Sequence, residues 1–150
     1  MAVTAKLFAN FPHLLLENKL AGDILSQTIK VALCTSGMSA VLAQATNDYW
    51  DDLVPASWEV ANGNGYTTGG ATLGTKTCDL TSLVTKFDAA DTAWAASTIT
   101  ARYAVIYYAT GTASTSLLIG YVDFGADQSS SSGTFQITWN ASGIFTITVA

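Results

Sequence analysis

The chain has 150 residues, of which 49% are hydrophobic and only 11% are charged, and its formal net charge is −5. An ordinary soluble domain carries about 25% charged residues, so either small polar side chains coat this protein or other subunits cover part of its apolar surface. Six basic residues offer no clustered charge for nucleic-acid phosphates, and no apolar run approaches the roughly 20 residues that span a bilayer. We therefore expect one domain whose partners include neither nucleic acid nor membrane.

The first 27 residues (1–27) are predicted to form a helical, anchoring segment. Between Ala2 and Leu20 the apolar residues recur at helix-like spacing, and Pro12 interrupts the run. A short helix or two turns is therefore expected rather than one long rod. The start lacks the basic-then-apolar layout of a signal peptide, which predicts folding in the cytoplasm of a host cell.

The remainder, residues 28–150, is predicted to be a single antiparallel β domain. Thr28–Cys34 alternates apolar residues with others as a strand does. Thr46 is expected to cap a short helix whose first turns carry Asp51 and Asp52, where acids favour the positive end of the helix dipole.

A glycine-rich stretch at residues 62–74 is predicted to be a turn-forming loop that leads into two short strands, Thr75–Leu80 and Ser82–Asp88. It only superficially resembles a dinucleotide loop, because Thr68 stands where the third glycine is required and no strand-loop-helix context surrounds it.

The second half of the chain gives the clearest strand pattern. Its connections are short and rich in glycine, serine and asparagine, which favours an antiparallel meander in an antiparallel β-sandwich or jelly-roll-like barrel. The four predicted strands are Thr98–Tyr108, Ser116–Phe124, Thr134–Trp139 and Ile144–Val149.

Two of these strands, Thr98–Tyr108 and Ser116–Phe124, are apolar on both faces. An antiparallel sheet with one solvated face should alternate apolar and polar residues. We therefore expect both faces to be covered, the second one by the N-terminal helix or by a neighbouring subunit.

The residues that could carry chemistry are few. Cys34 and Cys78 are expected to be buried free thiols, with a disulfide as the alternative, and two cysteines with one histidine cannot build a four-ligand zinc site without carboxylate help. His13, the one histidine, is expected to be a surface or packing residue rather than part of a catalytic triad. The sequence therefore predicts no enzyme, no cofactor and no metal centre.

Three carboxylate pairs have local structural explanations at a helix start, a turn and a strand end, although weak cation binding at the first or the third stays open. These pairs are Asp51/Asp52, Asp88/Asp91 and Asp123/Asp127. Arg102 stands alone in an apolar strand, either as an edge or surface residue, or paired with Asp123 or with an acid of another subunit.

Several stretches resemble small structural proteins of bacteriophage and prophage particles. They are Ile29–Ser36, Gly65–Leu73, Phe87–Trp94, Ser97–Tyr107, Leu118–Gly125 and Trp139–Ala150, within residues 28–150. The resemblance implies a virion component, and we favour a capsid decoration (cement) protein on the outer capsid surface, bound to the major capsid protein. The first 27 residues resemble the family least and are expected to carry the contact specific to the particle.

The decoration protein is expected to act as a symmetric dimer or trimer. A tail, neck or fibre component is the alternative, and a carbohydrate-binding module with Trp50, Trp58 or Trp94 as stacking platforms is the second alternative. The residues predicted to lie at an interface are Phe8, Phe11, Leu14, Leu15, Arg102, Tyr107 and Tyr108.

Overall fold

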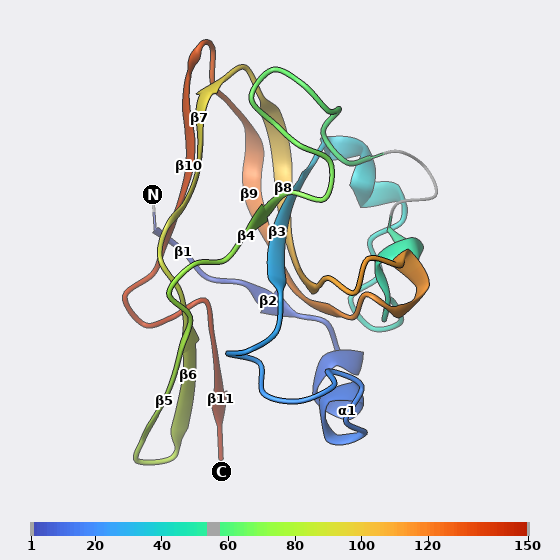
Figure 1. The fold of residues 1–150 in the computed structure, drawn as a ribbon, viewed down its shortest axis with the longest axis vertical. Coiled ribbons are helices and arrows are strands. Elements are labelled where there is room, and N and C mark those ends of the chain that lie inside the picture. Colours follow the sequence, from blue (N-terminus) through green and yellow to red (C-terminus); the bar gives the residue numbers. More distant parts are fainter. Residues whose placement is uncertain (1, 54–57, 150) are drawn as a thin grey trace.

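The computed structural model describes residues 2–53 and 58–149 (Figure 1). The fold is mostly β, as predicted, with several antiparallel sheets and one short α-helix, and it is consistent with a β-sandwich. None of the helices in the described ranges is long and apolar enough to cross a membrane.

The described strands form three sheets. The strands are β1 (Ala2–Val3), β2 (Lys6–Leu7), β3 (Ile29–Cys34), β4 (Ala71–Thr72), β5 (Thr77–Thr81), β6 (Val84–Asp88), β7 (Thr92–Ser97), β8 (Thr100–Tyr108), β9 (Leu118–Ser129), β10 (Gly133–Trp139) and β11 (Phe145–Thr148). The largest sheet has the order β2-β9-β8-β3-β4, and the two smaller sheets have the orders β1-β10-β7 and β11-β6-β5. The helices are α1 (Asn10–Leu16) and the 3-10 helices η1 (Ser36–Ala40), η2 (Trp50–Asp52) and η3 (Ala113–Thr115).

The central strands β3 and β8 are covered on both faces over most of their length, and β9 is covered from Leu118 to Val122, as their apolar composition predicts. One face packs against the two smaller sheets, of which β1-β10-β7 contributes Trp94 and Phe135 to the larger core and β11-β6-β5 contributes Phe87 and Phe145. The other face is covered by η1 and η2, through Met38, Trp50 and Leu53, and by Phe8 of the N-terminal segment. The expectation that the N-terminal helix or another subunit covers this second face is therefore wrong for the helix itself, because the residue before it and the segment that carries η1 and η2 lie over the face.

The predicted meander is only partly correct. β8 and β9 form the expected antiparallel hairpin, but β10 pairs with β7 and β1, and β11 pairs with β6. The reason is burial: in β10 only Phe135, Ile137 and Trp139 are buried, while the residues between them are at least partly exposed. Such a half-buried strand belongs to an outer layer of a sandwich rather than to the doubly covered central sheet.

The N-terminal residues 2–27 contribute to the same body as the rest of the chain. β1 pairs with β10 in parallel, and β2 pairs with β9. The helical part is limited to α1, in which Pro12 is the third residue. The first N–H groups of a helix have no partner within it, so proline fits this position without losing a hydrogen bond.

The short helix expected after Thr46 begins instead at Trp50, as a single 3-10 turn. The carboxylate of Asp52 reaches back and accepts hydrogen bonds from the backbone N–H groups of Asp48 at 2.8 Å and Tyr49 at 3.3 Å. The cap is therefore supplied from inside the turn, which leaves no capping role for Thr46.

Candidate interaction surface

Four of the predicted interface residues lie in the core of the single chain. Phe8, Phe11, Leu14 and Tyr107 have relative exposures of 0, 1, 8 and 4%. Segments distant in sequence cover them; the ring of Tyr107, for example, stacks on Trp50 with centroids 4.4 Å apart. This corrects their assignment to an interface, because these side chains stabilise the monomer and leave almost no surface to a partner.

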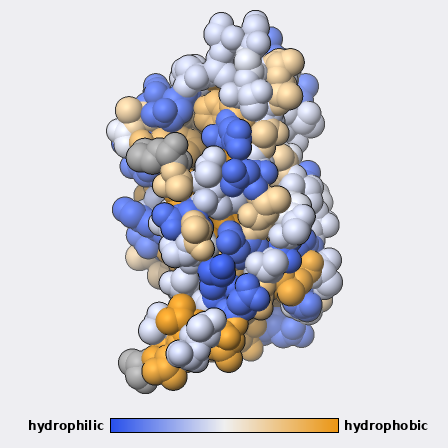
Figure 2. All heavy atoms as spheres, turned by 90° about the vertical axis from the view of Figure 1, so that its left-hand side faces the viewer, coloured by the Kyte–Doolittle hydropathy of each residue, from blue (hydrophilic) through white to orange (hydrophobic). Residues whose placement is uncertain are grey.

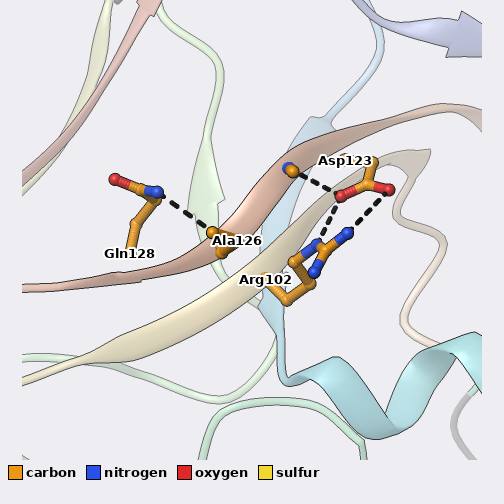
Figure 3. Close-up of polar contacts among 5 residues, drawn as sticks. Arg102, Asp123, Ala126 and Gln128 are labelled. Carbon is orange, nitrogen blue, oxygen red and sulfur yellow. Dashed lines mark hydrogen bonds and ion pairs between the residues drawn. The ribbon is translucent and has the colours of Figure 1, made fainter.

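The other three predicted interface residues are partly exposed. Leu15 and Tyr108 pack at the margin of the larger core. The guanidinium of Arg102 donates two hydrogen bonds to the carboxylate of Asp123 on the neighbouring strand (Figure 3). This pairing lowers the pKa of Asp123 and raises that of Arg102. Of the alternatives for Arg102, the structure therefore shows the pair within the chain.

An apolar surface lies at the end of the molecule formed by β5, β6 and β11. In these antiparallel strands Phe145, Phe87 and Cys78 are cross-strand neighbours, and Ile147, Thr85 and Leu80 form the next row. Alternation along each strand places both rows on the same face of the sheet. The sheet therefore has one apolar face, and its other face carries mostly threonine, aspartate and lysine.

The outer part of this face is uncovered in the single chain. Hydrophobic surface gathers at the lower end of the molecule in Figure 2, over the ends of these strands. We call this surface the apolar tip, and it consists of Leu80, Leu83, Ile147 and Val149, which are 71, 59, 38 and 61% exposed. Most large apolar side chains of a monomer are withdrawn from water, so a cluster of this kind marks an interaction site.

A groove of about 280 Å³ continues from the apolar tip toward α1. It lies between the apolar face of the sheet and the segment that follows α1, and Ile147 belongs to both the tip and the groove. We call it the apolar groove, and its hydrophobic walls are Phe11, Leu15, Ile24, Phe87, Phe145 and Ile147. Two of the predicted interface residues, Leu15 and the almost fully buried Phe11, thus line the surface that the structure leaves open.

The acidic residues mostly have local structural partners. Asp91 accepts hydrogen bonds from the Trp139 N–H at 3.0 Å and from the Gln136 side chain at 3.2 Å, and Asp88 lies 3.7 Å from the Lys86 ammonium. Within the described ranges, no three His, Cys, Asp or Glu side chains are grouped so that they could hold a metal ion.

A half-buried carboxylate that no sequence motif indicated organises the glycine-rich loop. Glu59 accepts hydrogen bonds of 2.6 Å from the Tyr66 hydroxyl and from the Gly69 N–H. The Tyr66 hydroxyl in turn accepts the Leu33 N–H at 3.1 Å, and the Tyr107 hydroxyl donates to the Gly69 carbonyl at 2.7 Å. Burial raises the pKa of Glu59. The network fastens the loop to β3 and β8, and no local motif in the sequence indicates it.

The tryptophans and cysteines occupy different environments. Trp50 and Trp94 are 7 and 6% exposed, so their rings are not available to stack on a sugar. Trp58 is partly buried. Both cysteines are free, and Cys34 is buried as expected, but Cys78 is exposed because β5 is an edge strand that nothing in the described chain covers.

A scan against protein-family models, a search of curated proteins and a search of solved structures returned no match to this chain.

Proposed function

We propose that the protein is a structural component of a bacteriophage particle, and specifically a decoration protein that binds the outside of the capsid shell. The observation that carries this proposal is the apolar tip on a chain with only 11% charged residues. A free monomer gains nothing from holding four large apolar side chains in water, whereas a protein that works in an assembly buries them. The sequence resemblance supports the same class.

A decoration protein stabilises a shell by bridging neighbouring capsid subunits. A standard protein–protein contact of about 1,600 Å² in total is sufficient for one stable interface. The repeated lattice of the shell then adds avidity, because several copies linked to one another bind several sites at once. Such work needs a rigid body and apolar contacts, and it needs no reactive side chain.

The proposal is tested by adding the purified protein to capsid shells that lack it. We expect saturable binding in a fixed ratio to the major capsid protein, and shells that resist heating better than undecorated ones. Electron microscopy of the decorated shells should show added density over the whole outer surface. Absence of binding to shells of the phage that encodes the chain would contradict the proposal.

The same images separate the decoration role from the alternative role in the virion. Density over the whole shell supports a decoration protein, whereas density confined to one vertex or to the tail would assign the chain to the tail, neck or fibre instead.

A further inference from the structure

The sheet β11-β6-β5 has the composition of one layer of a sandwich. Its apolar face is covered near Phe87 and Phe145 by the rest of the chain, and it is open farther out at the apolar tip. Two sheets that pack face to face lie about 10 Å apart and interdigitate their apolar side chains. The outer half of this sheet therefore lacks the second layer that its inner half has.

The apolar face of the β11-β6-β5 sheet carries no charged side chain. The residues of β5, β6 and β11 that point to it are apolar, threonine or cysteine, while Asp79, Lys86 and Asp88 point to the opposite face. A partner that presented charge to this surface would lose solvation without gaining an ion pair. The surface therefore fits an equally uncharged apolar face.

The apolar tip supplies about half of the area that one partner of a standard interface contributes. The four side chains of the apolar tip together expose on the order of 400 Å², which lies within the range of the largest patches on monomers. A standard interface takes about 800 Å² from each partner. The mouth of the apolar groove, which is continuous with the tip through Ile147, supplies further area that is apolar except at Asp23 on the segment after α1.

We propose that the apolar tip is the contact between two copies of this chain, which stack the outer halves of their β11-β6-β5 sheets face to face about a two-fold axis. A second copy meets all three requirements, because it brings an identical uncharged face, a matching sheet geometry and an equal area. Although each chain carries a net charge of −5, the strands that meet in this contact bring no like charges together. In a two-fold contact the same patch serves both partners.

The biological purpose of this contact rests on the proposed function, since a dimeric unit makes twice as many contacts with the shell as a monomer does. Its own test uses the purified chain without capsids. A failure of the dimer and a failure of shell binding are therefore separate results.

The test compares two substitutions that add the same charge on opposite faces of one strand. Leu80→Lys places an ammonium group in the apolar tip, and Thr81→Lys places it on the polar face one residue later. Sedimentation at several protein concentrations should show a dimer for the wild type and for Thr81→Lys. Leu80→Lys should weaken the dimer by at least about 30-fold, the effect of truncating one central contact.

A second measurement follows the thiol of Cys78, which lies on the same face and borders the apolar groove. Its reaction with a thiol reagent should slow several-fold as the wild-type concentration rises into the dimer range, and it should stay fast in Leu80→Lys. Circular dichroism confirms that both variants fold.

Three results would overturn the proposal. A wild-type chain that stays monomeric at all concentrations has no such contact, even if its apolar tip binds capsid shells. A dimer with unchanged affinity in Leu80→Lys would lie elsewhere on the molecule. If Leu80→Lys and Thr81→Lys weakened the dimer equally, the contact would not be confined to the apolar face of β5.

Discussion

Removing the hydroxyl group of Tyr66 should destabilise the fold strongly although the ring stays in place. Tyr66→Phe removes the 2.6 Å hydrogen bond to Glu59 and leaves the Leu33 N–H, which is buried, without its acceptor. Losing a hydrogen bond to a charged group costs about 1.5–3 kcal/mol, and an unsatisfied buried donor costs about 1–3 kcal/mol. Since the two losses overlap, we expect the free energy of unfolding to fall by about 3 kcal/mol.

Urea denaturation followed by tryptophan fluorescence measures this change, with an unaltered dependence on urea concentration as the sign that only stability has changed. Tyr103→Phe is the matched control, since its hydroxyl has no hydrogen-bond partner among the described residues, and it should stay within about 0.5 kcal/mol of the wild type. If Tyr66→Phe behaved like Tyr103→Phe, the network would contribute no net stability and our account of the loop would be refuted.

Three further predictions follow from the same structure. Gly70→Ala should lower the free energy of unfolding in urea by more than about 2 kcal/mol, because φ is +73° and a Cβ would collide with the carbonyl oxygen of Val31 in β3. Gly111→Ala has open space around its Cβ and should cost about half as much. Burial raises the pKa of Glu59 in the folded state. The contribution of Glu59 to the free energy of unfolding should therefore be fully present below the ordinary glutamate pKa of about 4.3, and it should be lost as the pH rises through the higher folded value. Glu59→Gln should remove this decline in melts recorded across that pH range. A thiol reagent should titrate one cysteine, Cys78, in the dilute native protein, and reach Cys34 only on unfolding, since burial raises the pKa of Cys34.

The sequence predicted the class of the fold because its strands in the second half are long and their turns are marked by glycine, serine and asparagine. It also predicted the doubly covered hairpin β8–β9 from apolar residues on both faces. The pair Arg102–Asp123 was one of the alternatives, because the two residues fall on neighbouring strands of that hairpin.

The strand order was not predictable from local pattern. Turn residues show where a strand ends, but they do not show whether the next strand stays in the same sheet or crosses to the other layer, as β10 and β11 do. Burial of Phe8 and Tyr107 depends on contacts with segments distant in sequence, so apolar character alone could not separate core from interface. The apolar tip could not be recognised either, because Leu80 and Val149 come together only once β6 has paired with β11.

The pairing of β1 and β2 has a consequence for how the chain folds as it is synthesised. Ala2 pairs with Thr138, and Lys6 pairs with Tyr121, so the first strands have no partner until most of the chain has left the ribosome. Closing loops of this length costs entropy before any contact compensates for it, and folds dominated by such pairings form in milliseconds to seconds. The two sheets that contain β1 and β2 are therefore completed late, and until then the edges of β9 and β10 that these strands cover stay open to neighbouring copies.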